Sequence, residues 1–240
     1  MLLNPTTLVV DFNLADRSIA SDVKMIINST KFQTDKIFQD SRVIDWLNRF
    51  RLNVDEIINI RVAGAIERRP GVLHSVFLEV WFVYKGRSLQ RSILIRGPAV
   101  VVIVLLRCTT FQTSQFLVVR QPRIATGEES YEFPSGNHDK STPLDSAVQE
   151  LQEETGLLIS RQRFVCLRKA TIVCESALDE LADWFLVELD QEEGLIGEFG
   201  AVSEGEYTRT ELITWDTLLA INSFHMIAAR TLIQEFYNRS

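Results

Sequence analysis

The sequence predicts an α/β protein in which a small, mainly antiparallel N-terminal module precedes an α/β/α sandwich with a mixed sheet. Residues 99–106 form a continuous apolar run, as expected for a strand that is covered on both faces by helices. After that run, strand-like and helix-like segments alternate, whereas before it strand-like segments follow one another across short turns. We therefore divide the chain into an N-terminal α+β module, residues 1–95, and a second domain, residues 96–240.

The first module is predicted to contain one helix and three strands. Residues 34–50 place apolar side chains at helical spacing, which indicates an amphipathic helix. Residues 57–66 and 72–84 alternate as strands do, and the turn at Lys85 and Gly86 leads into a third strand, residues 88–95.

The second domain is predicted to contain a well-defined helix, residues 143–155. Thr142 is a suitable N-cap before Pro143, and Gly156 is a suitable stop. The apolar side chains repeat at i, i+3, i+4 and i+7 and form the buried stripe: Leu144, Ala147, Val148 and Leu151. Further strands are expected at 115–119, 164–173, 184–189 and 210–215, followed by C-terminal helices.

Composition and charge restrict the class of protein. The 240 residues are 46% hydrophobic and 24% charged, which suits a globular protein with one sizeable core and a smaller module. The net charge of −7 disfavours a broad nucleic-acid-binding surface, because such surfaces need clustered Lys and Arg. The run 99–106 is far too short to span a bilayer, so no membrane partner is expected.

The three cysteines, Cys108, Cys166 and Cys174, form no metal-ligand pair and have apolar neighbours. We expect them to be reduced, buried packing residues. A reducing, intracellular compartment follows, either the cytoplasm or an organelle.

Three acids near the end of the predicted helix carry the chemistry. Glu150, Glu153 and Glu154 stand at i, i+3 and i+4, so their carboxylates share one helix face. Carboxylate oxygens in such a group suit Mg²⁺ or Mn²⁺ together with substrate phosphate oxygens. A solvated acidic helix face is the alternative for such a run taken alone.

The flanking residues resemble a known family motif. The loop 132–136, Glu-Phe-Pro-Ser-Gly, and the segment 149–157, Gln-Glu-Leu-Gln-Glu-Glu-Thr-Gly-Leu, resemble the Nudix box. Segments 96–100 and 120–127 resemble the ADP-sugar and ADP-ribose diphosphatase branch of Nudix hydrolases, particularly the plant-type nucleotide-sugar diphosphatases. The resemblance covers about residues 36–238.

Three departures separate this chain from the motif. The spacing from Gly136 to the last glycine is one residue short, Ser141 or Thr142 replaces the first glutamate, and Gln149 replaces the arginine. In the family that arginine usually holds a neighbouring glutamate, so Gln149 is expected to hold Glu153 less firmly.

The resemblance implies the roles of the metal ligands and the base. Glu150, Glu154 and the backbone carbonyl of Ser135 would hold Mg²⁺ or Mn²⁺, with Glu153 as a further ligand or an orienting, catalytic carboxylate. Glu204 or Glu206, in a glycine-flanked loop, would activate or position the water.

Substrate contacts are predicted at two arginines and one acid. Arg96 and Arg123 stand beside glycine or proline turns, and a guanidinium offers paired donors to phosphate oxygens. Glu132, in the loop before Ser135, is assigned to substrate binding with them.

The implied function is hydrolysis of nucleoside-diphosphate sugars to a nucleoside monophosphate and a sugar 1-phosphate. Two alternatives stay open: a Nudix-fold binding or scaffold subunit that has lost turnover, and removal of diphosphate from RNA 5′ ends, which suits the acidic charge less well.

A homodimer is the expected assembly. In the resembling family such an N-terminal module builds the dimer. The alternating apolar residues Val76, Leu78, Val80 and Phe82 are more than we expect one small module to bury on one face alone.

Overall fold

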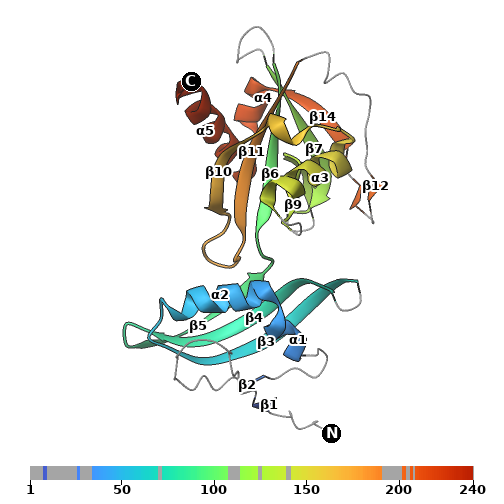
Figure 1. Cartoon of the computed structure of the whole chain (residues 1–240). Coiled ribbons are helices and arrows are strands. Elements are labelled where there is room, and N and C mark those ends of the chain that lie inside the picture. The colour runs from blue at the N-terminus through green and yellow to red at the C-terminus, as the bar shows by residue number, and fades with distance from the viewer. Residues whose placement is uncertain are drawn as a thin grey trace. The chain divides into compact units, whose positions relative to one another are not determined.

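The computed structural model describes residues 34–69, 72–107, 114–123, 126–138, 142–190 and 209–239, together with four two-residue strands. The chain forms two compact units (Figure 1). The first unit contains Met1–Gly97 and Ile172–Glu180, and the second contains Pro98–Thr171 and Leu181–Ser240. The segment Ile172–Glu180 was expected in the second domain, so the first unit is not continuous in sequence.

The first unit is built on a three-stranded antiparallel sheet. The strands lie in the order β3 (Glu56–Arg69), β4 (Val72–Tyr84) and β5 (Arg87–Ile95). Lys85 and Gly86 both have positive φ, 50° and 70°, as a two-residue turn between twisted strands requires. The three predicted strands are confirmed with slightly wider bounds.

The predicted helix 34–50 is instead two helices, α1 (Thr34–Gln39) and α2 (Ser41–Arg51). Asp40 between them has extended backbone angles, and its side chain accepts a hydrogen bond from the Arg42 amide at 3.0 Å. An aspartate that caps a helix in this way stabilises a new start, which explains the break.

The alternating apolar side chains of β4 are buried inside the first unit, contrary to the expectation that a second chain is needed to cover them. Val76, Leu78, Val80 and Phe82 are all buried, in one core with residues of α1 and α2. The reason is that the two helices cover the face to which these side chains point. On the opposite face Phe77 is 40% exposed.

The second unit contains a mixed sheet. Its main path runs through β10 (Phe164–Ile172), β11 (Leu181–Asp190), β6 (Ala99–Arg107), β7 (Gln115–Arg123) and β14 (Arg209–Thr214). Two shorter strands complete it: β8 (Glu128–Glu132) pairs with β7, and β9 (Ser135–Asn137) pairs with β6. Strands β6 and β11 are parallel, whereas β7 is antiparallel to both β6 and β14.

Helices cover both faces of this sheet. Ala147 and Leu151 of α3 (Pro143–Thr155) share a core with alternate residues of β6 such as Val102. The intervening side chains point the other way, where α4 (Trp215–Ala220) and α5 (Phe224–Arg239) cover them. The predicted α/β/α sandwich with a mixed sheet is confirmed.

The prediction that the cysteines are buried is wrong for two of them. Cys166 is exposed on β10, Cys174 is half-buried, and both are free thiols. Strand β10 lies at the edge of the sheet, so much of its length faces solvent. Cys108 lies outside the described residues.

Within the part of the chain that the structure describes, no helix is both long enough and apolar enough to cross a membrane.

Candidate metal and substrate site

Helix α3 begins and ends where the sequence predicted. The Thr142 hydroxyl accepts a hydrogen bond from the Asp145 amide at 3.1 Å, so Thr142 is the N-cap. Gly156 ends the helix with φ of 75°, a left-handed conformation that favours glycine. These two ends place the three acids in the last two turns of the helix.

Glu154 ties the last turn of α3 to the start of β9. Its side chain is buried, with 6% of the residue exposed, and its carboxylate accepts a hydrogen bond from the Ser135 amide at 2.9 Å. Ser135 is itself fixed, because it pairs with Val101 of the central strand β6. A hydrogen bond from a backbone N–H to a buried carboxylate is charge-assisted, so it holds the Glu154 carboxylate in place.

Glu150 lies against the next residue of β9. A Cβ atom at Gly136 would lie 2.2 Å from the Glu150 Cδ atom, far inside contact distance. A side chain at position 136 would therefore displace the Glu150 carboxyl group from this place beside the β9 backbone. The structure thus brings together Ser135, Glu150 and Glu154, which were predicted as metal ligands.

Glu153 is held by Gln149, which corrects the expectation of a loose carboxylate. The Gln149 Nε2 atom donates a hydrogen bond to Glu153 Oε1 at 2.5 Å, one helical turn apart. The amide therefore makes the contact that an arginine would make, without its charge. Glu153 itself is exposed.

The acids do not converge on one point in this structure. Among the described residues, no three His, Cys, Asp or Glu side chains lie close enough to hold a metal ion together. The predicted ligand set that counts Glu153 together with Glu150 and Glu154 is therefore not found as one group among the described residues. Glu150 and Glu154 are the two acids that lie against β9.

Arg123 and Glu132 form a paired contact in the second unit. The Arg123 Nε atom donates to Glu132 Oε1 at 2.7 Å, and Arg123 Nη2 also contacts Glu132 Oε2. Gln121 donates to the same carboxylate at 3.4 Å. Burial alone would raise the pKa of Glu132, but the hydrogen bonds and charge of Arg123 outweigh it and lower the pKa. Glu132 therefore stays ionised, and 43% of the Arg123 side chain remains exposed.

His225 joins this neighbourhood although sequence reasoning assigned it no role. Its ring lies edge-on to the buried Trp184 ring, with 5.8 Å between centroids. Burial lowers the pKa of His225, the charge of Glu132 opposes this, and the charge of Arg123 adds to it. The sequence carries no local signal for His225, because helix α5 is far from Glu132 along the chain.

The remaining predicted site residues are Arg96, Glu204 and Glu206. Arg96 belongs to the first unit, where its Nη1 atom lies 3.3 Å from Glu180. Glu206 is in the short strand β13 (Glu206–Tyr207), which pairs with β12 (Val202–Ser203) and lies alongside β7. Glu204 lies outside the described residues. The roles of these residues stay predictions.

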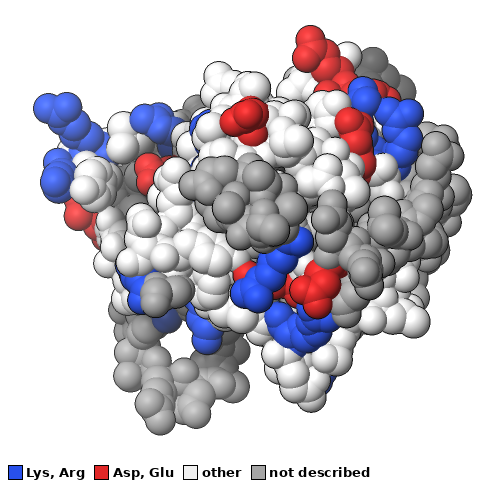
Figure 2. Space-filling view, turned by 90° about the horizontal axis from the view of Figure 1, so that it is seen from above, with Lys and Arg blue, Asp and Glu red and all other residues white. Residues whose placement is uncertain are grey.

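Charges of both signs are mixed on the face that Figure 2 shows. Among the residues described there, Lys and Arg side chains stand next to Asp and Glu side chains in small groups. A broad basic surface of the kind that binds nucleic acid is not drawn on this face.

Comparison with known proteins finds similarity in structure alone. No protein-family model matches the chain, and no curated protein matches it. Among solved structures, the chain is similar to the crystal structure of an ADP compounds hydrolase, with a TM-score of 0.55 and 16% sequence identity. The match covers 76% of this chain and 93% of that one. At this identity the similarity shows a shared fold, an α/β fold with a mixed sheet, and no more than that.

The lowered pKa of His225 predicts a pH-dependent stability. An ordinary histidine titrates near pH 6.5, so below about that pH the unfolded chain binds a proton more readily than the folded one. The free energy of unfolding should therefore fall as pH decreases through this range. We expect urea unfolding of a His225→Gln variant to show a smaller loss of stability between pH 7.5 and pH 5.5 than the unmodified protein shows. Equal losses in both proteins would contradict this assignment.

Proposed function

We propose that this protein is a Mg²⁺-dependent hydrolase of nucleoside-diphosphate sugars of the ADP-sugar or ADP-ribose type, with a nucleoside monophosphate and a sugar 1-phosphate as products. The observation that carries the proposal is the juxtaposition of Ser135, Glu150 and Glu154 at the junction of β9 and α3. The fold similarity to an ADP compounds hydrolase and the resemblance of segment 149–157 to the Nudix box support it.

The donor atoms at this junction fit a hard divalent cation. Mg²⁺ and Mn²⁺ prefer carboxylate and carbonyl oxygens, which Glu150, Glu154 and the Ser135 backbone would provide. When bound, such an ion neutralises phosphate oxygens and lowers the pKa of a water molecule. Two contacts position the proposed ligands: the Ser135 amide donates a hydrogen bond to Glu154, and Gly136 leaves room for the Glu150 carboxyl group.

The reaction requires a water oxygen to attack one phosphorus of the diphosphate. A new P–O bond forms, the bridging P–O bond breaks, and the second phosphate leaves with the bridging oxygen. A carboxylate must accept the proton from water, and Glu153, Glu204 and Glu206 are the proposed candidates. Glu153 has a defined orientation through Gln149.

Substrate contacts are proposed for two arginine side chains and one glutamate. Arg123 would donate to phosphate or sugar oxygens from its exposed part, while Glu132 fixes the direction of its guanidinium group. Arg96 is proposed to contact the diphosphate as well. These roles follow from the chemistry of the side chains.

An assay of purified protein with ADP-ribose, ADP-glucose and other nucleotide sugars, with Mg²⁺ or Mn²⁺ added, tests the function directly. Nucleoside monophosphate should appear with metal and disappear with EDTA. The absence of product from every nucleotide sugar would overturn the proposal.

A binding or scaffold subunit is the second candidate. It is favoured by Gln149 in place of the arginine, and by the fact that within the described residues the acids do not form one cluster. Calorimetry with ADP-ribose distinguishes the two functions, because a binding subunit would bind it without forming product, whether or not Mg²⁺ is present.

Glu150→Gln and Glu154→Gln should each reduce the hydrolysis rate by on the order of 10² to 10³, because each removes a negative charge proposed to hold the metal. Both changes preserve side-chain size, so circular dichroism should show an intact fold. Glu235→Gln is the matched control, since Glu235 forms only exposed ion pairs, with Arg168 and Arg239. Near-normal rates in both site variants at saturating Mg²⁺ would disprove the metal assignment.

Gln149 should matter through its hydrogen bond to Glu153. Gln149→Met keeps the length of the side chain and removes the donor, so kcat should fall several-fold. Gln149→Arg restores a donor and adds charge, so kcat should equal or exceed that of the unmodified protein. Equal kcat values in all three proteins would show that the orientation of Glu153 does not affect turnover.

We also propose that the protein is a homodimer formed through the first unit. The sheet face that carries the exposed Phe77 and the half-buried Trp81 supports this, since exposed aromatic groups often mark interfaces. Light scattering at micromolar concentration should give about twice the chain mass of 27.4 kDa. Phe77→Glu should lower the mass toward that of the monomer, whereas Val165→Glu, at an exposed position of the second unit, should not.

A further inference from the structure

Segment Ile172–Glu180, here called the strap, follows β10, precedes β11 and packs within the first unit. It pairs with the end of β5 through backbone hydrogen bonds. The Leu94 amide donates to the Ala177 carbonyl at 2.8 Å, and the Asp179 amide donates to the Leu94 carbonyl at 3.4 Å. Leu178 forms a parallel bridge with Leu94. The strap therefore pairs with the edge strand β5 of the first sheet through a single bridge.

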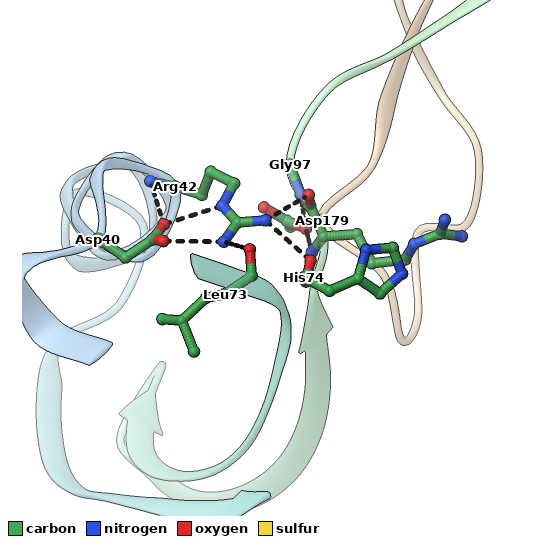
Figure 3. Close-up of polar contacts among 7 residues, drawn as sticks. Asp40, Arg42, Leu73, His74, Gly97 and Asp179 are labelled. Carbon is green, nitrogen blue, oxygen red and sulfur yellow. Dashed lines mark hydrogen bonds and ion pairs between the residues drawn. The ribbon is translucent and has the colours of Figure 1, made fainter. Parts of the chain in front are cut away.

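The Asp179 side chain fastens the strap to the turn that follows β5. Its Oδ1 atom accepts hydrogen bonds from the Arg96 amide at 2.7 Å and the Gly97 amide at 3.1 Å (Figure 3). Two amides on one carboxylate oxygen form a charge-assisted pair of hydrogen bonds. Glu180 adds the contact to the Arg96 side chain.

Arg42 holds the same turn from the side of helix α2 (Figure 3). Its Nη1 atom donates to the carbonyls of His74 at 2.8 Å and Arg96 at 3.2 Å, and its Nη2 atom donates to the Leu73 carbonyl at 2.9 Å. Asp40 binds the same guanidinium with both carboxylate oxygens, at 2.9 and 2.8 Å. One arginine thus joins α2, β4 and the end of β5.

The pKa shifts of Arg42 and Asp40 favour the charged form of both side chains. The hydrogen bonds that Arg42 donates to Asp40 and the negative charges of Asp40 and Asp179 raise the pKa of Arg42 against the effect of burial. The pKa of Asp40 is lowered, because its contacts with Arg42 outweigh the raising effect of burial. Arg42 therefore lies between two carboxylates, one from its own helix and one from the strap.

Gly97 allows this arrangement for two independent reasons. Its φ is +84°, a conformation that L side chains rarely adopt. A Cβ atom there would lie 2.6 Å from the Arg42 Cδ atom. The turn at Arg96 and Gly97 thus passes directly against the Arg42 side chain, with the Asp179 carboxylate on its amides.

We propose that the strap is a latch: Asp179 docks it on the Arg96–Gly97 turn, Arg42 also holds this turn, and loss of either contact releases strap and turn together. The proposal is independent of the hydrolase function. In this proposal the first unit has two states, one with the strap docked and one with it released. Asp179 and Arg42 together hold the turn in the docked state.

Hydrogen exchange on the full-length protein tests the latch. In Asp179→Ala the amides of Leu94, Arg96 and Gly97 should exchange on the order of tenfold faster, because charge-assisted hydrogen bonds are lost. Amides of the inner strand β4, such as those of Val80 and Phe82, should keep their rates. Glu79→Gln is the control, since it removes an ion pair of the same sheet with Arg61 and should leave the turn protected.

Arg42→Met supplies the second arm of the experiment. It should accelerate the same three amides, and the double variant with Asp179→Ala should show no more acceleration than the stronger single variant, because the two residues act on one turn. Fully additive effects, or unchanged exchange at Arg96 and Gly97 in Asp179→Ala, would overturn the latch.

If Asp179→Ala accelerates exchange throughout the first unit, Asp179→Asn decides the outcome. It preserves the side-chain size and one acceptor oxygen, so a latch predicts a smaller acceleration confined to the turn and the strap. Acceleration spread evenly over β3, β4 and β5 in Asp179→Asn as well would show that Asp179 serves overall stability and no latch exists.

Discussion

The hydrogen bond from the Ser135 amide to the buried Glu154 carboxylate determines how the candidate site is organised. It joins the C-terminal turn of α3 to β9, which is itself paired with the central strand β6. One residue further along, Gly136 gives the Glu150 carboxyl group its place. Because both acids are positioned against a strand held by the sheet, their geometry depends on the register of β9 with β6. The proposed metal site is therefore a property of the sheet as much as of the helix.

The chain arranges its other charged groups in the second unit by pairing them locally. Arg123 and Glu132 form paired contacts across adjacent strands, and Gln149 contacts Glu153 along one helix. The neutral amide of Gln149 orients an acid without cancelling its charge, which leaves more negative charge near a cation than an arginine would leave. His225 interacts electrostatically with the Arg123–Glu132 pair, and burial lowers the pKa of its ring.

The first unit depends on a comparable constraint at Arg42. Its guanidinium group donates hydrogen bonds to three backbone carbonyls at the start of β4 and after β5, and the negative charges of two carboxylates act on it. The strap takes part in this unit although its neighbours in sequence belong to the mixed sheet of the second unit. A loop between two strands can thus form hydrogen bonds with a sheet that is distant in sequence.

The sequence by itself determined the features that depend on a few neighbouring residues. Thr142 and Gly156 set the ends of α3, the apolar run of β6 indicated a strand buried on both faces, and Lys85 with Gly86 marked a hairpin. Capping, periodicity and turn chemistry act over three or four residues, so they can be read along the chain. The mixed sheet between helices followed from the order of these elements.

Only the tertiary structure decided which distant groups meet. The contact of Gly136 with Glu150, the approach of His225 to Glu132, and the docking of Asp179 on Gly97 depend on strand register and helix placement, which no short segment encodes. The burial of Val76 and its alternating neighbours under α1 and α2 was misjudged for the same reason, because periodicity reveals an apolar face but not what covers it. Local patterns determined where helices and strands form, and long-range packing determined which of their side chains lie close to one another.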